Sequence, residues 1–121
     1  MVDEVEKLIG SAPTKTCQLD SVRTWLVKDV RGLLSAFVAL LFNTSLVFGC
    51  FPSDFKEAVI RPLLKKSGLD TSELKIFRPV SNLSFLSKLL ERVVQIRQEA
   101  FLERNDMMPP MQSAYHRLLQ Y

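Results

Sequence analysis

Residues 55–94 read FKEAVIRPLLKKSGLDTSELKIFRPVSNLSFLSKLLERVV, and this stretch decides the fold that we expect. Apolar residues dominate 58–64, a basic loop follows at 65–68, and a second extended segment covers 76–81. Beyond it, apolar residues recur about every 3.6 positions, which is typical of an amphipathic helix. Asn82 or Ser84 is expected to start this helix, and Asn105 to end it. The stretch therefore predicts a small hairpin followed by a long helix.

The positive charge of the chain is concentrated in the same stretch. The whole chain has 16 basic and 13 acidic residues, a net charge of +3. Residues 56–97 hold nine basic and four acidic residues, so this segment carries +5, and the segments on either side each carry −1. A concentrated basic loop on a hairpin is suited to a partner that bears phosphate groups.

Length and composition limit the possible protein classes. With 121 residues, of which 47% are hydrophobic, the chain has room for one domain with a modest core. Two cysteines, Cys17 and Cys50, do not make a disulfide framework, and we expect both to be reduced and buried. One histidine and two distant cysteines exclude a tetrahedral zinc site. We expect an intracellular protein, cytoplasmic or nuclear, without a signal peptide.

The part of the chain before the hairpin is expected to be helical. Residues 1–9 have apolar positions at helical spacing, and residues 10–16 form a linker. Asp20 or Ser21 is expected to cap a helix through residues 25–27. A further apolar helix is expected over residues 33–48, with Gly49 as its stop signal.

The apolar helix at 33–48 has two possible interpretations. No charged residue occurs from 32 to 53, a length close to the roughly 20 residues that span a bilayer. Polar residues at 43–45 interrupt the middle of this segment, and the dense apolar run is confined to residues 33–42. These interruptions favour a buried core helix over a membrane span.

Three short stretches carry a resemblance to a known family. They read PLLKK at 62–66, FRPVS at 77–81 and LSKLLERVV at 86–94. In this order and spacing they resemble the first fingers motif of reverse transcriptases from non-LTR (LINE-like) retrotransposons. Residues 11–20 and 111–115 resemble the neighbouring family segments. Residues 21–23, where the family has prolines, and 116–121 depart from the family pattern.

The resemblance implies roles for the basic residues. In reverse transcriptases the fingers hairpin folds over the incoming deoxynucleotide, so the implied nucleotide-binding residues are Lys65, Lys66 and Arg78. The implied nucleic-acid-binding residues are Arg61, Lys75, Lys88 and Arg92. Fixed cations stabilise a triphosphate and the charge that develops during transfer, and an arginine fork can bridge two phosphate oxygens.

The residues alone leave other roles open. Lys65 and Lys66 could be solvated loop charges, and Lys88 and Arg92 could form a solvated helix face on which Lys88 pairs locally with Glu91. Arg78 could pair with Glu57 or Glu73 across the hairpin.

We expect an α+β fold, predominantly α, with helices around one small fingers-type hairpin, as in an incomplete palm-and-fingers polymerase domain. The expected organisation is an N-terminal helix and linker at 1–18 and a partial reverse transcriptase domain at 19–121. Within that domain, approach helices precede the hairpin at 57–81, the long helix at 83–105 and a truncated tail at 106–121. The side that would face the palm is expected to expose apolar surface.

The resemblance implies a piece of an RNA-directed DNA polymerase. The intact enzyme would use Mg²⁺, deoxynucleotides, an RNA template and a DNA primer. Its catalytic aspartates lie in palm motifs that this sequence does not contain, so we expect no catalytic residue, no metal ligand and no cofactor here, and no activity of the chain alone. The alternative is a small helical interaction or membrane-associated protein that uses residues 33–51. We expect no membrane partner, and the oligomeric state is left open.

Overall fold

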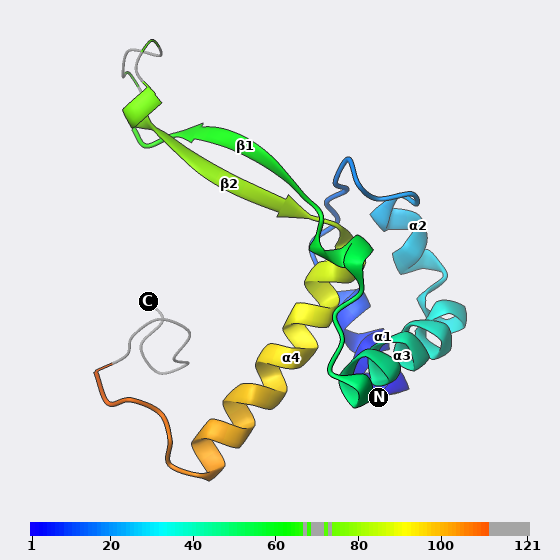
Figure 1. The fold of residues 1–121 in the computed structure, drawn as a ribbon. Helices are drawn as coiled ribbons and strands as arrows, with labels where there is room; N and C mark the ends of the chain where they lie inside the picture. The colour runs from blue at the N-terminus through cyan, green and yellow to red at the C-terminus, as the bar shows by residue number, and fades with distance from the viewer. Residues whose placement is uncertain (67, 69–71, 73, 112–121) are drawn as a thin grey trace. The chain divides into compact units, whose positions relative to one another are not determined.

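The computed structural model describes residues 1–66, 68, 72 and 74–111, and the chain divides into two compact units, Met1–Leu90 and Glu91–Tyr121. Its elements in chain order are α1 (Val2–Ser11), α2 (Thr24–Asp29), α3 (Arg31–Phe48), the 3-10 turn η1 (Ser53–Lys56), β1 (Ala58–Leu64), the 3-10 turn η2 (Leu74–Ile76), β2 (Phe77–Leu83) and α4 (Phe85–Arg104) (Figure 1). Helices outnumber the two strands, so the expected fold class, α+β and predominantly α, is confirmed.

The two strands form an antiparallel hairpin, as the sequence predicts. Ala58 lies opposite Leu83 at the open end, and Leu64 lies opposite Phe77 near the loop. The Lys65 N–H donates to the Ile76 carbonyl at 2.8 Å, which extends the pairing by one position. Because the sheet has two strands, each is an edge strand, and edge strands tolerate proline. Pro62 and Pro79 lie opposite each other in the middle of the hairpin.

The return strand is longer than expected, and this fixes the start of α4. It runs to Leu83, so Asn82 is excluded as one of the two expected starts of the helix, because Asn82 is still paired with Val59. Ser84 occupies the position before the helix, and its Oγ accepts a hydrogen bond from the Ser87 N–H at 3.3 Å. This is the usual arrangement of an N-terminal serine cap.

Asp20 caps a different helix from the one that the sequence suggests. Neither Asp20 nor Ser21 caps α2, which starts at Thr24 after Arg23 without a side-chain cap. Instead, one Asp20 carboxylate oxygen accepts from the N–H of Phe85, the first residue of α4, and the other accepts from the Cys17 N–H, both at 2.7 Å. One side chain thus joins the linker to the helix that follows the hairpin.

The core of the first unit lies where α1 packs against α3. Its buried apolar residues are Val5 and Ile9 of α1, Val27 of α2, Val38, Ala39 and Phe42 of α3, and Phe85, Leu89 and Leu90 at the start of α4. Buried Ser87 donates its hydroxyl to the Phe55 carbonyl at 2.7 Å, which joins α4 to the turn before the hairpin.

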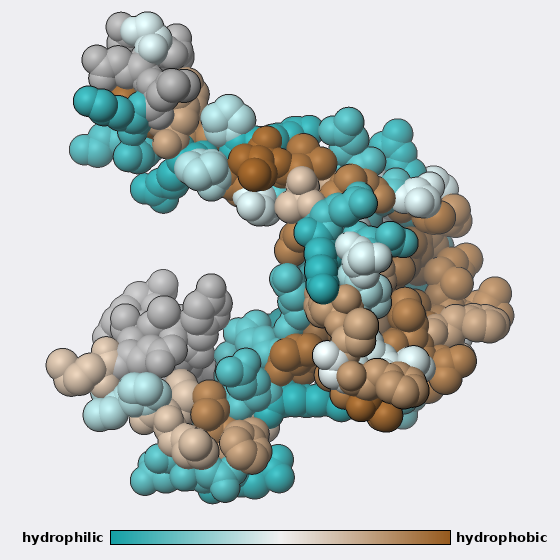
Figure 2. All heavy atoms as spheres, in the orientation of Figure 1, coloured by the Kyte–Doolittle hydropathy of each residue, from teal (hydrophilic) through white to brown (hydrophobic). Residues whose placement is uncertain are grey.

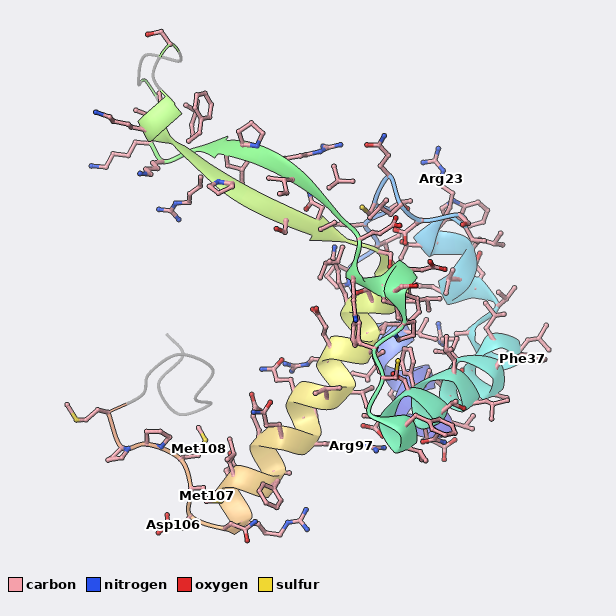
Figure 3. All side chains as sticks on the ribbon, viewed as in Figure 1. Arg23, Phe37, Arg97, Asp106, Met107 and Met108 are labelled. Atoms are coloured by element: carbon pink, nitrogen blue, oxygen red, sulfur yellow. The ribbon has the colours of Figure 1, made fainter. Side chains whose placement is uncertain are left out.

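Helix α3 is buried on one side only. Phe42 is 0% exposed, whereas Phe37 is 68% and Val47 81% exposed. Figure 2 shows apolar side chains gathered over this part of the molecule, and Figure 3 shows Phe37 projecting away from the ribbon. The prediction of a buried core helix therefore holds for one face. The other face is exposed apolar surface, which the prediction of a buried helix did not include.

The cysteines differ from the prediction that both are buried. Both are free thiols, but Cys17 is half-buried and Cys50 is exposed. Cys50 directly follows Gly49, at the turn that ends α3, so it lies outside the packed face of the helix.

Gly49 ends α3, as predicted. It has a φ of 60°, and the N–H groups of Gly49 and Cys50 donate to the carbonyls of Leu46 and Ser45. These bonds supply donors to two carbonyl groups of the last helical turn. The turn requires a left-handed backbone at its end, a conformation that favours glycine.

Replacing Gly49 by alanine is expected to lower the free energy of unfolding by about 1 kcal/mol, because a Cβ is strained at positive φ. No heavy atom lies within 4 Å of the added Cβ, so the cost is conformational rather than steric. Gly32→Ala is the matched control, since it lies inside α3 and its Cβ would meet Glu6 at an ordinary 3.9 Å. Urea titration should show a lower free energy of unfolding for Gly49→Ala and a higher one for Gly32→Ala, because alanine is favoured over glycine inside a helix. Equal losses would contradict the role of the backbone at Gly49.

Candidate nucleic-acid interface

One face of the hairpin carries three of the predicted basic site residues. Directly paired residues share a face of an antiparallel sheet, and successive residues alternate between faces. The pairs Arg61–Val80 and Leu63–Arg78 therefore lie on the same face. The next position on this face of β1 is Lys65, whose backbone continues the pairing. We name Arg61, Lys65 and Arg78 the basic face.

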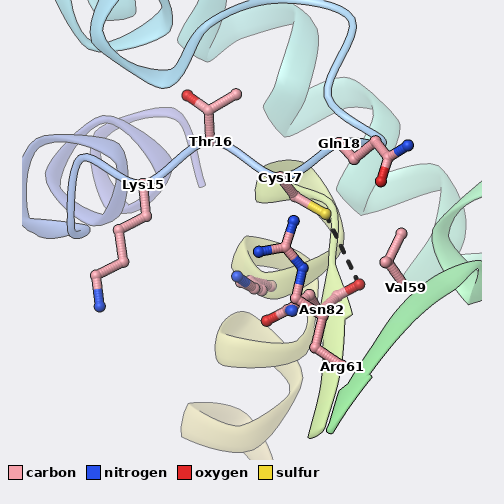
Figure 4. A pocket seen from close by; sticks show the side chains of 8 residues that line it. Lys15, Thr16, Cys17, Gln18, Val59, Arg61 and Asn82 are labelled. Carbon is pink, nitrogen blue, oxygen red and sulfur yellow. Dashed lines mark hydrogen bonds between the residues drawn. The ribbon is translucent and has the colours of Figure 1, made fainter. Parts of the chain in front are cut away.

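A cavity of about 180 Å³ lies at the base of the hairpin, on the basic face. It is lined by Lys15, Thr16, Cys17, Gln18, Val59, Arg61, Asn82 and Lys88 (Figure 4). Three segments supply its cations, namely the linker before α2, strand β1 and the first turn of α4. None of the lining residues is acidic. We name this the hairpin-base cavity, and its charge suits an anion.

Hydrogen bonds fix the walls of the hairpin-base cavity. The Cys17 thiol lies 3.8 Å from the Asn82 carbonyl, to which it donates, and this contact ties the linker to β2 (Figure 4). The bonds from Asp20 to Cys17 and Phe85 hold the same linker against the start of α4. The backbone around the cavity is therefore held in place by segments far apart in the sequence.

The basic residues of the hairpin, and Lys88 of α4, have no acidic partner in the part of the chain that the structure describes. The side chains of Arg61, Lys65, Lys66, Lys75, Arg78 and Lys88 are exposed and make neither a hydrogen bond nor an ion pair there. The alternative pairing of Arg78 with Glu57 is therefore not formed, and Glu73 lies outside the described residues. The pairing of Lys88 with Glu91 is also not formed.

The structure brings together some of the predicted residues and not others. Arg61 and Lys88 meet in the hairpin-base cavity, and Arg78 and Lys65 continue along the hairpin. Lys75 lies in η2 near the loop. Arg92 belongs to the second unit and donates to Gln95 Oε1 at 2.9 Å, as expected for a residue on a helix surface.

Sequence reasoning missed Lys15. It lies in the linker, 46 positions before Arg61 by number, and a single lysine in a loop carries no pattern of its own. The fold places it in the hairpin-base cavity beside Arg61 and Lys88. Only its position within the stretch 11–20, which resembles the segment before the fingers motif, could have drawn attention to it.

The described residues offer no ligand set for the Mg²⁺ that the family resemblance implies. Among residues 1–66, 68, 72 and 74–111, no three His, Cys, Asp or Glu side chains lie close enough to hold a metal ion.

Comparison with known proteins decides the family. No family model matches the chain. The chain is 32% identical over 117 residues to the probable RNA-directed DNA polymerase from transposon BS of Drosophila melanogaster, a match over 94% of this chain. It is 33% identical over 97 residues, or 77% of this chain, to the RNA-directed DNA polymerase from mobile element jockey of the same organism. This chain is a relative of non-LTR retrotransposon reverse transcriptases.

The matches cover a small part of each transposon reverse transcriptase. The chain spans 13% of the length of the BS protein and 10% of the jockey protein. The similarity to these reverse transcriptases is therefore confined to one segment of each of these longer proteins.

Proposed function

We propose that this chain supplies the fingers hairpin of an RNA-directed DNA polymerase and that the hairpin binds phosphate groups. Lys65, Lys66 and Arg78 would bind the incoming nucleotide, and Arg61, Lys75, Lys88 and Arg92 would contact the template or primer. One observation carries the proposal, namely that Arg61, Lys65 and Arg78 share a face of the hairpin and have no acidic partner among the described residues. Cations left unneutralised by the protein are available to phosphates.

The proposed role is binding and positioning rather than chemistry. Basic side chains over a triphosphate stabilise charge, whereas the transfer itself requires carboxylates that hold two metal ions. The described residues provide no such cluster. The chain alone is therefore proposed to bind nucleic acid without copying it.

The first test is nucleic-acid binding measured against salt concentration. A single-stranded RNA oligonucleotide should bind at low salt and lose affinity steeply as salt rises, because each phosphate contact releases counterions. Arg61→Ala and Arg78→Ala should each weaken binding and reduce the slope of log K against log salt by about 1. Fluorescence anisotropy measures both quantities.

Lys7→Ala is the control for this test. Lys7 is an exposed lysine on α1, so its loss changes the net charge by the same amount without touching the hairpin. The proposal predicts an unchanged slope for Lys7→Ala. A folded protein that binds no RNA at low salt, or three variants that weaken binding equally, would refute binding by the basic face.

A second candidate function rests on α3. This helix has 18 residues with a mean hydropathy of 1.6, and 22% of it is buried, so by length and composition it could cross a membrane. The candidate is membrane association through this helix. Fractionation separates it from the first proposal, because a membrane-inserted chain pellets with vesicles through high salt and alkali. Release by either treatment would exclude insertion.

A further inference from the structure

We propose that the hairpin-base cavity holds a phosphodiester group of a polynucleotide strand, at a position separate from the incoming nucleotide that Lys65, Lys66 and Arg78 would bind. This inference rests on the proposed function and adds the location, the residues and the type of ligand. It also gives a role to Lys15, which the sequence did not single out.

The lining of the cavity matches a phosphodiester. Lys15, Arg61 and Lys88 supply three positive charges, and no lining residue is acidic. The side-chain amides of Gln18 and Asn82 complete the wall and have no hydrogen-bond partner among the described residues. Each amide offers N–H donors to phosphate oxygens. Charge-assisted bonds from lysine and arginine to such oxygens are stronger than bonds between neutral groups.

The backbone around the cavity is formed before a ligand arrives. Asp20 holds the linker against α4 through two bonds of 2.7 Å, and Cys17 contacts Asn82 of β2. The three segments that supply the cations are thereby fixed relative to one another. A site with its backbone preorganised loses less conformational entropy on binding.

The cavity lies away from the end of the hairpin that would bind the incoming nucleotide. Arg61 belongs both to the cavity and to the basic face, which continues through Arg78 to Lys65. Arg61 and Lys65 are four residues apart along β1 and its extension, or about 13 Å at 3.3 Å per residue. A phosphate in the cavity therefore lies apart from a triphosphate at Lys65, Lys66 and Arg78, as a phosphate of a template or primer strand would.

Cys17 provides a direct test, because it lines the cavity and Cys50 lies at the end of α3. A single-stranded RNA oligonucleotide at saturating concentration should slow alkylation of Cys17 by iodoacetamide several-fold and leave the rate at Cys50 unchanged. Mass spectrometry of the two peptides measures both rates in one sample. A deoxynucleoside triphosphate and inorganic phosphate, at equal phosphate concentration, should protect Cys17 much less.

Two variants test the cations of the cavity. Lys15→Ala and Lys88→Ala remove exposed side chains without partners among the described residues, so the fold should be retained, as circular dichroism can verify. Each should reduce the salt slope of RNA binding by about 1 and weaken the protection of Cys17. Lys7→Ala should do neither.

The outcomes separate this inference from the proposed function. Salt-dependent RNA binding without protection of Cys17 would overturn the cavity site and leave the basic face intact as a binding surface. Protection by the triphosphate equal to that by RNA would overturn the assignment to a polynucleotide. Absence of RNA binding at low salt by a folded protein would overturn both proposals.

Discussion

Replacing Phe42 by alanine is expected to lower the free energy of unfolding by about 3–5 kcal/mol, enough to unfold a chain of this size at room temperature. Phe42 is fully buried on the face of α3 that packs in the first unit. Its removal leaves a cavity that the neighbouring helices cannot close completely. Urea or thermal denaturation followed by circular dichroism measures the loss.

Phe37→Ala is the matched control for this substitution. It removes the same side chain from the same helix, but Phe37 is 68% exposed. Surface substitutions of this kind usually change stability by less than about 0.5 kcal/mol. Similar losses for the two variants would show that α3 packs through a different face from the one described.

Replacing Asp20 by alanine is expected to lower the free energy of unfolding by about 2–4 kcal/mol. The substitution leaves the N–H groups of Cys17 and Phe85 without their acceptor, and hydrogen bonds to a charged group contribute about 1.5–3 kcal/mol each. Asp20→Asn retains one oxygen acceptor and should show a smaller loss. Chemical denaturation of the three proteins tests this order.

Asp29→Ala serves as the control for Asp20. Asp29 is the exposed last residue of α2, and its side chain has no partner among the described residues. Its removal changes the net charge equally and should leave stability nearly unchanged. If Asp20→Ala proved as harmless as Asp29→Ala, the link between the linker and α4 would not contribute to stability.

Local patterns in the sequence predicted most of the elements. The strand at 58–64 is confirmed because a short apolar run between a polar turn and a basic loop specifies an extended segment. Gly49 is confirmed as the end of α3 because a left-handed residue favours glycine. Both signals depend on neighbouring residues only, and sequence reasoning recovers such signals well.

Contacts between distant residues could not be predicted in the same way. Asp20 lies 65 positions from Phe85, and a capping pattern before α2 gave no sign that the carboxylate would cap α4 instead. Helical periodicity at 33–48 predicted the helix but did not predict which of its faces would pack against other helices. The cations of the hairpin-base cavity likewise come together only through tertiary packing, so Lys15 was missed. The roles assigned to Lys65, Lys66 and Arg78 stay predictions until binding is measured.

Raising the salt concentration is expected to have two separate effects on this chain. One acts on the exposed apolar side of α3, and the other acts on the basic hairpin. Sulfate and similar salts strengthen the association of apolar surface, so they should drive copies of the chain together through Phe37, Val47 and their neighbours. The same increase in salt weakens attraction between the basic hairpin and phosphates. Raising salt should therefore release RNA while promoting self-association, and a nonionic detergent should reverse only the second effect.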